Sequence, residues 1–340
     1  MVLKQSYYNL YQTQLRRDIQ TKVYHKESLI IHLFGKEYFC LVKSKKIWPL
    51  KLSRFQIMGV ELPSDEEFVK QELARVRETY RANRGNISFQ FWFINEIISF
   101  ENVGMRESNQ IQDIKQMRLN LRQRIIETYD LKLSFRENMP QSNILYFIDK
   151  TDEELLADMN SWAKEKVKNW FNKKVDFEIA KPEQYEEFYE RRRGVAGKKW
   201  FSPITKQQLF DLMQFLDEND CGKMFLSFHE GEMIAGNICL FDDHHLVYLY
   251  GFSERGRNRY GGHHYLKFRV FQWGRAHGFD YCDMMGGAPT GFDDHPLAGV
   301  SSFKESLGGS KIELYGNYDL VLNSFLYKIF EKYTHRRGKH

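Results

Sequence analysis

Hydrophobic and polar positions along this chain change repeatedly between a period of two and a period near 3.6, which predicts a fold that mixes strands with helices. Short apolar runs bounded by turn residues are typical of strands. The expected strands are 29–34, 37–43, 87–98, 144–148, 175–179, 224–228, 233–241, 246–252 and 279–284. Capping boxes and first-turn prolines introduce apolar residues at helical spacing. The expected helices are 64–82, 113–129, 151–174, one after Pro182, one after Ser202 and Pro203, and 260–277.

The second half of the chain orders its elements as three strands, a helix and one more strand. This order resembles the N-acyltransferase fold of the GNAT class, in which a splayed strand pair leaves a cleft. The first half offers a comparable mix of a terminal helix, two strands, a helix and a strand. We therefore expect an α/β protein, α+β in its mixed sheets, with two GNAT-like acyltransferase domains packed side by side, 1–150 and 151–340.

Composition narrows the class of protein without identifying it. The chain has 340 residues, of which 42% are hydrophobic and 28% charged, and these values exclude a disordered chain and favour about two domains. The net charge of +5 is too small to imply a nucleic-acid partner by itself. Neither a signal-peptide core nor a membrane-spanning run is apparent. Reduced, widely separated cysteines favour a cytoplasmic protein; they are Cys40, Cys221, Cys239 and Cys282.

The carboxyl-terminal third carries an ordered set of short motifs. They are Gly286-Gly287, Asp293-Asp294-His295-Pro296-Leu297, Gly299, Phe303-Lys304, Gly308-Gly309 and Tyr318-Asp319-Leu320-Val321. In this order they resemble the end of the Fem family of peptidoglycan bridge aminoacyltransferases. The strand at 248–253 and the capped helix that begins at Thr151 are similar to further family segments. Since 217–222 is a short connection without heptads, the resemblance is to the form that lacks a coiled-coil arm.

The resemblance implies an enzyme that moves an amino acid from aminoacyl-tRNA to the stem peptide of a peptidoglycan precursor, either lipid-linked or nucleotide-linked. It implies no metal and no cofactor, because aminoacyl-tRNA is the co-substrate. The partners would be aminoacyl-tRNA and the precursor. A peripheral contact with the inner face of the cell membrane would follow from the lipid-linked acceptor.

Lys304 is the candidate catalytic residue. Acyl transfer from an ester to an amine passes through a tetrahedral oxyanion, and a positioned ammonium group can stabilise that charge. The family assigns this task to the matching lysine, with Phe303 as its packing partner and substrate contact. The alternative is an ordinary solvated surface lysine. Asp283, at the end of a strand, is a polar candidate for orienting the site.

Further substrate contacts are expected in both halves. Tyr248 and Tyr250 alternate along one strand, so we expect both rings on one side, lining the acceptor channel, or as half-buried core tyrosines. The remaining candidates are placed by the resemblance alone. They are Lys206 and Phe210 at the acceptor's diphosphate and sugar, and, in the first half, Asn95 and Arg17.

Basic residues suggest where a polyanion would bind. Arg255, Arg257 and Arg259 precede a paired glycine and are candidate contacts to tRNA or phosphate. A similar loop binds the pyrophosphate in coenzyme A acyltransferases, although tyrosine replaces the first glycine here. The segment 164–199 is a second candidate tRNA surface, or only a charged helix face.

Two other hypotheses remain open. One is a coenzyme A dependent GNAT-type N-acyltransferase, and the other is a noncatalytic binder of nucleic acid or cell-wall precursors. Adjacent histidine pairs, 244–245 and 263–264, point apart and do not predict a metal site. Cys282 lies within an apolar strand and is interpreted as a core thiol rather than a nucleophile.

Overall fold

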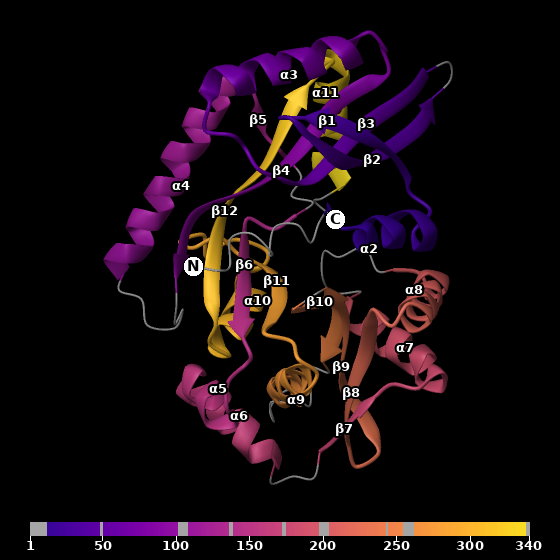
Figure 1. Cartoon of the computed structure of the whole chain (residues 1–340), viewed down its shortest axis with the longest axis vertical. Coiled ribbons are helices and arrows are strands. Elements are labelled where there is room, and N and C mark those ends of the chain that lie inside the picture. Colours follow the sequence, from indigo (N-terminus) through magenta and orange to yellow (C-terminus); the bar gives the residue numbers. More distant parts are fainter. Residues whose placement is uncertain are drawn as a thin grey trace.

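The computed structural model describes residues 12–47, 50–100, 108–135, 139–171, 175–196, 204–242, 244–253 and 262–337. The strands of these ranges form a single mixed sheet of twelve that extends along the molecule (Figure 1). The strands follow the order β1-β2-β3-β4-β12-β6-β11-β10-β9-β8-β7, with β5 beside β12. Helices cover both faces of this sheet, so the expected mixed α/β fold class is confirmed.

The first half of the chain builds one end of the sheet. Its elements are α2 (Gln14–Asp18), the π-helical turn η2 (Ile19–Val23), β1 (Glu27–Leu33), β2 (Lys36–Ile47), β3 (Leu50–Val60), α3 (Glu66–Arg81), β4 (Asn86–Phe100), α4 (Ser108–Tyr129), β5 (Lys132–Leu133) and β6 (Ser142–Phe147). Strands β1, β2 and β3 form an antiparallel meander, and β4 lies parallel to β3 after the α3 crossover.

The second half builds the other end. Its elements are α5 (Asp152–Asp158), α6 (Ser161–Phe171), β7 (Asp176–Ile179), the 3-10 turn η4 (Pro182–Gln184), α7 (Tyr185–Ala196), α8 (Lys206–Glu218), β8 (Gly222–His229), β9 (Glu232–Asp242), β10 (His245–Ser253), α9 (Gly262–Ala276), β11 (Tyr281–Gly287), α10 (Ala298–Ser306), β12 (Ser310–Val321) and α11 (Ser324–Arg337). Strands β8, β9 and β10 again form an antiparallel meander, and β11 lies parallel to β10 after α9.

The two halves therefore repeat one topology, and they exchange strands. Strand β6, made in the first half, pairs with β11 of the second half, and β12 at the end of the chain pairs along β4 (Figure 1). Strands β6 and β12 also pair with each other. A domain boundary at residue 150 stays a prediction, and the strand just before it is hydrogen-bonded on both sides to strands of the second half.

Most predicted elements are found, and four details differ. Strand β3 escaped prediction because polar residues face inward along it: buried Arg54 pairs with Asp319, and Gln56 donates to Gln90. The predicted helix over 151–174 divides into α5 and α6, because Asn160 caps a new helix by accepting from the backbone N–H of Ala163 at 2.8 Å.

Two helix caps also differ from the predicted ones. Asp65, rather than Ser64, caps α3, and Thr205 forms the capping box of α8. The cap predicted at Ser202 and Pro203 lies outside the described residues. No helix within the described ranges is long and apolar enough to cross a membrane.

Candidate active site

Lys304 lies in the last turn of α10, where its side chain turns into the protein. Only 5% of the residue is exposed, so the alternative of a solvated surface lysine is wrong. Its Nζ atom donates to the backbone carbonyl of Gly286 at 2.6 Å and to that of Met285 at 3.1 Å. The sequence predicts that Phe303-Lys304 opens a helical segment, and this is wrong, because Lys304 lies near the end of α10. Its catalytic role stays a prediction.

The end of β11 is shaped to present these two carbonyl groups. The pairing of β11 with β6 is irregular between Asp283 and Gly286, and Met285 adopts a left-handed backbone conformation with φ of 59°. The buried carboxylate of Asp283 accepts from the Met285 backbone N–H at 2.6 Å and so holds this strained turn. Asp283 thereby positions the acceptors of Lys304.

The paired glycines of the sequence motifs have a steric explanation. A Cβ atom on Gly286 would collide with Pro140, and one on Gly287 would lie 2.6 Å from Ser301 Oγ. Gly308 and Gly309 have φ of 89° and 85°, a conformation that favours glycine. The motif glycines therefore allow β11, α10 and β12 to pack closely around Lys304.

A second buried lysine accompanies the first. Lys267 of α9 is 1% exposed, and its Nζ lies 3.7 Å from the ring centroid of Tyr248. The Lys304 Nζ lies 6.0 Å from the same centroid. Within the described residues, the Nζ of Lys267 has no hydrogen-bond partner. Cation–π attraction is thus its principal described stabilisation.

Burial controls the charge of both lysines. It lowers the pKa of Lys304 to about 7, an effect that the charge of Asp283 opposes and the charge of Lys267 strengthens. Burial likewise lowers the pKa of Lys267 to about 8. The centre therefore contains two ammonium groups that are close to losing their protons at neutral pH, beside one carboxylate.

Tyr248 and Tyr250 do not share a side of the sheet, so that expectation is wrong. The register of β10 against β9 shifts between them, which places an extra residue, Leu249, in the strand. Tyr248 joins the core beneath α9, whereas Tyr250 packs on the opposite face, where α7 and α8 lie. There its hydroxyl is 2.9 Å from the hydroxyl of Tyr24, in the first half of the chain.

Phe303 packs against two histidines rather than into open space. Its ring centroid lies 4.6 Å from that of His263 and 4.8 Å from that of His264. Burial lowers the pKa of His264 to about 4, so this ring is neutral near pH 7. Within the described ranges, no three His, Cys, Asp or Glu side chains are grouped to hold a metal ion.

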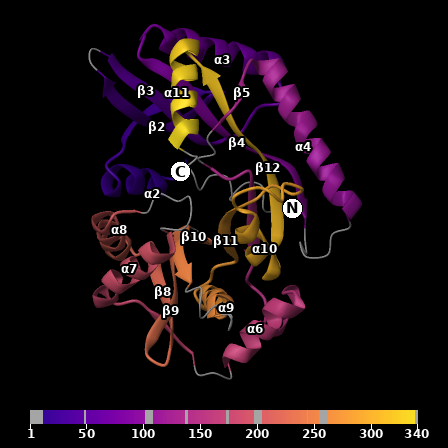
Figure 2. The same ribbon diagram turned by 180° about the vertical axis from the view of Figure 1, so that it is seen from behind.

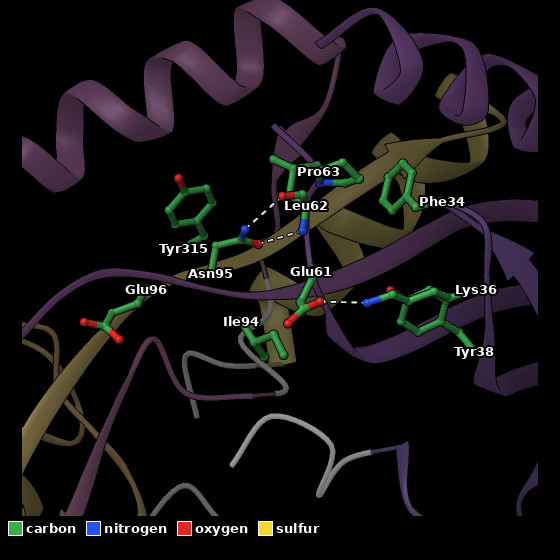
Figure 3. A pocket seen from close by; sticks show the side chains of 10 residues that line it. All are labelled: Phe34, Lys36, Tyr38, Glu61, Leu62, Pro63, Ile94, Asn95, Glu96 and Tyr315. Atoms are coloured by element: carbon green, nitrogen blue, oxygen red, sulfur yellow. Dashed lines mark hydrogen bonds and ion pairs between the residues drawn. The ribbon is translucent and has the colours of Figure 1, made fainter. Parts of the chain in front are cut away.

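A concave site lies in the first half, at the point where β3 ends and α3 has not yet begun (Figure 3). Its cavity volume is about 520 Å³. Its lining residues are Phe34, Lys36, Tyr38, Glu61, Leu62, Pro63, Ile94, Asn95, Glu96 and Tyr315. We call it the β3–α3 pocket. It occupies the position, relative to the repeated topology, that the end of β10 occupies in the second half.

Asn95 lines this pocket, but its amide is already engaged. Its Oδ1 accepts from the Leu62 backbone N–H at 2.7 Å, and its Nδ2 donates to the Leu62 carbonyl at 2.9 Å (Figure 3). The Asn95 side chain thus pairs with the Leu62 backbone, just after β3, in the way that a neighbouring strand would. Beside it, Lys36 forms an ion pair with Glu61 at 2.8 Å. A substrate contact by Asn95 stays a prediction.

The other candidate residues lie apart from Lys304. Lys206 is exposed and forms an ion pair with Glu186, while Phe210 packs edge-on against Tyr185. Arg17 is half-buried, 5.6 Å from the ring centroid of Phe39. The predicted phosphate contacts lie outside the described residues; they are Arg255, Arg257 and Arg259.

Lys267 is the site residue that sequence reasoning missed. The inward face of α9 consists of buried residues at helical spacing, among them His264, Phe271 and Gly274. Lysine at position 267 falls on that face. A cation at a predicted core position was therefore the available signal.

Comparison with solved structures identifies the class of fold. The structure superposes on the crystal structure of FemX with a TM-score of 0.67 and 17% sequence identity, covering 95% of this chain and 94% of that one. At this level of identity the likeness establishes the fold alone. Residues 205–335 also match a family model, the FemAB family. The Fem resemblance is therefore confirmed, and the matched segment includes Lys267, Lys304 and the β11 turn.

Curated relatives match a similar length of chain. The lipid II:glycine glycyltransferase of Staphylococcus saprophyticus is 31% identical over 102 residues, which cover 30% of this chain and 25% of that protein. The protein of the same name from Staphylococcus epidermidis is 29% identical over 122 residues, 36% of this chain and 29% of that protein. The aligned parts thus span less than a third of these relatives.

Proposed function

We propose that this protein is an aminoacyltransferase that moves an amino acid from aminoacyl-tRNA to the stem peptide of a peptidoglycan precursor. The observation that carries the proposal is the buried ammonium group of Lys304, held by two backbone carbonyls within the segment that matches the FemAB family. The names of the relatives, lipid II:glycine glycyltransferases, support the choice of acceptor.

The chemistry follows from what Lys304 has left to donate. An ammonium group carries three N–H donors, and two of them bond to Met285 and Gly286. The third can bond to the oxyanion that forms when the acceptor amine attacks the ester carbonyl. Because the lysine is buried, this interaction is stronger than it would be in water.

The transfer balances without a covalent enzyme intermediate. The acceptor nitrogen forms a bond to the carbonyl carbon, the bond from that carbon to the ribose oxygen breaks, and a proton passes from the amine to the departing hydroxyl. Cys282 precedes Asp283 in β11. It is buried, and burial raises the pKa of its thiol well above the ordinary value. It is therefore poorly suited to act as a nucleophile.

The β3–α3 pocket is a proposed acceptor-binding site. Its aromatic and aliphatic lining suits the uncharged parts of a peptide, and Glu61 and Glu96 outnumber its one cation, Lys36. An acceptor peptide that carries a free amine complements this charge balance. Tyr248 is a proposed substrate contact because its ring lies beside Lys267 and Lys304. The resemblance to the Fem family proposes Phe303, Lys206, Phe210 and Arg17 as further substrate contacts, and the three arginines at 255–259 as tRNA contacts.

A mass measurement tests the proposal. The purified protein is incubated with a mixed pool of charged tRNAs and a nucleotide-linked muramyl pentapeptide, and the pentapeptide is then weighed. A gain of one residue mass with wild type, and none with Lys304→Met, supports aminoacyl transfer. An unchanged mass, with acylation of amines from acetyl coenzyme A instead, would reject the proposal in favour of a coenzyme A dependent N-acyltransferase.

The lipid-linked form of the acceptor bears on where the protein works. If it uses this form, the reaction takes place at the inner face of the cell membrane, with the protein in the cytoplasm. Replacing the nucleotide-linked acceptor with lipid II in vesicles tests this part separately. Transfer to lipid II at a lower protein concentration than the nucleotide-linked acceptor requires would support a reaction at the membrane.

A further inference from the structure

Helix α11 exposes large apolar side chains along one side. Phe325 is 73% exposed, Ile329 51% and Tyr333 45%. Their spacing of four residues places them above one another on one face of the helix. Tyr327, on the opposite face, is buried and donates to Asp319 at 2.8 Å, which attaches the helix to the sheet. The apolar stripe is therefore not needed to hold α11 in place.

Lysines accompany the stripe on the same side. Lys328 and Lys332 are exposed and alternate with the apolar residues. Lys45, at the tip of β2, extends its Nζ to 5.9 Å from the ring centroid of Tyr333. Glu331, the acidic residue of this helix, interacts electrostatically with Asp319 and Tyr327 on the inner side. We define the α11 face as Phe325, Lys328, Ile329, Lys332 and Tyr333.

Figure 2 shows α11 lying across the first half of the sheet on the outside of the molecule. An apolar stripe flanked by lysines suits an anionic lipid surface, because the rings and branched chains enter the acyl boundary while the ammonium groups stay with the phosphates. RNA would engage the lysines and leave the apolar side chains in water. A second copy of the face would bring its lysines against the same lysines.

We propose that the α11 face binds the surface of an anionic lipid bilayer. This inference rests on the proposed function only for its biological purpose, since a lipid-linked acceptor is found at such a surface. It assigns the membrane contact to a helix that lies over the first half of the sheet, rather than to the basic residues at 164–199 and 255–259. The contact would bring the first half, with the β3–α3 pocket, to the membrane.

Vesicle flotation tests the proposal directly. Full-length protein is mixed with vesicles of phosphatidylcholine alone or with about three parts in ten phosphatidylglycerol, and bound protein is measured after centrifugation. We expect binding to the anionic vesicles and at least tenfold weaker binding by the double variant Phe325→Ser, Ile329→Ser. The variant Lys328→Gln, Lys332→Gln should weaken binding severalfold and reduce its dependence on salt.

A matched control uses exposed apolar residues elsewhere. Met117 and Leu119 of α4 are 45% and 40% exposed, and the double variant Met117→Ser, Leu119→Ser should bind vesicles like wild type. All variants should transfer to the nucleotide-linked acceptor equally, so failure of this proposal is separate from failure of the enzyme assignment. Wild-type protein that ignores anionic vesicles, equal binding by the α11 variant, or a stripe that instead mediates dimers in sedimentation would overturn it.

Discussion

Lys267 and Lys304 approach the same aromatic ring, with Nζ atoms 3.7 Å and 6.0 Å from the centroid of Tyr248. They come from different helices, α9 and α10, and both are almost fully buried. Like charges held this close in a low-dielectric interior disfavour each other's protonated form. Lys267 is therefore placed to adjust the proton affinity of Lys304.

The first prediction concerns this coupling. Lys267→Met removes a positive charge beside Lys304, so the pKa of Lys304 should rise from about 7, by roughly half a unit to one unit. If the ammonium form is the active one, activity is lost as pH rises through that pKa, and the alkaline limb should move to higher pH. The measurement is kcat against pH with the nucleotide-linked acceptor. An exposed-lysine control, Lys70→Met, should leave the limb in place; a limb unmoved in both variants would contradict the coupling.

The second prediction concerns Lys304 itself. Lys304→Met removes the proposed oxyanion donor and should lower kcat by about 10²–10³-fold, with a smaller effect on KM for the acceptor. Circular dichroism should show an unchanged fold, because methionine fits a buried, unbranched side-chain site. Retention of full activity in a folded variant would remove Lys304 from the mechanism.

The third prediction concerns stability against pH. The pKa of Lys304 is about 7 in the folded protein and near its ordinary value of 10.5 when unfolded. Between these values the unfolded state binds more protons, so the contribution of Lys304 to stability rises with pH from about 7 to 10.5. Urea unfolding at pH 7, 8 and 9 should show a smaller rise for Lys304→Met than for wild type. An equal rise in both proteins would mean that the lysine is not desolvated.

The fourth prediction separates direct transfer from a thioester route. Cys282→Ala should retain transfer activity within about threefold, since its buried thiol has a raised pKa and little thiolate. Iodoacetamide should leave the native enzyme active for the same reason. Loss of activity in a folded Cys282→Ala protein, together with a mass adduct on the wild-type chain, would indicate a covalent intermediate.

The fifth prediction concerns Asn95. Asn95→Ala removes both hydrogen bonds to the Leu62 backbone and should reduce the free energy of unfolding by about 1–3 kcal/mol. It should also raise KM for the acceptor more than it lowers kcat, because the wall of the β3–α3 pocket loosens. Asn95→Asp keeps the acceptor for the Leu62 N–H. Its free energy of unfolding and its KM should therefore lie between those of wild type and Asn95→Ala. A changed KM with unchanged stability would instead favour direct substrate contact.

Sequence reasoning succeeded where the local pattern and the tertiary environment agree. The meander from β8 to β10 and the helix α9 follow from turn residues and periodicity, whereas the paired glycines around Lys304 were found through the resemblance to the Fem family. It failed where polar residues are buried. Strand β3 was not predicted, because Arg54 and Gln56 are polar residues at buried positions and their partners, Asp319 and Gln90, lie far away in sequence. An extra residue at Leu249 also separated two tyrosines that simple alternation places together.

Much of the centre depends on pairing that no local pattern reveals. The position of Lys304 could be inferred from a motif, but its carbonyl acceptors arise from the left-handed turn at Met285. Lys267 reaches Tyr248 only because α9 crosses between β10 and β11. Such relationships are set by sheet order, which requires the whole chain.

The exchange of β6 and β12 constrains how the protein is made. Strand β4 is synthesised early, yet the partner along its outer side, β12, comes from residues 310–321. On the ribosome, the first half keeps an open strand edge until residues 310–321 have emerged. Unpaired strand edges promote association between chains. Slow synthesis of the segment up to β12 should therefore expose nascent chains to misassembly, and a chaperone that covers β4 would be most useful in that interval.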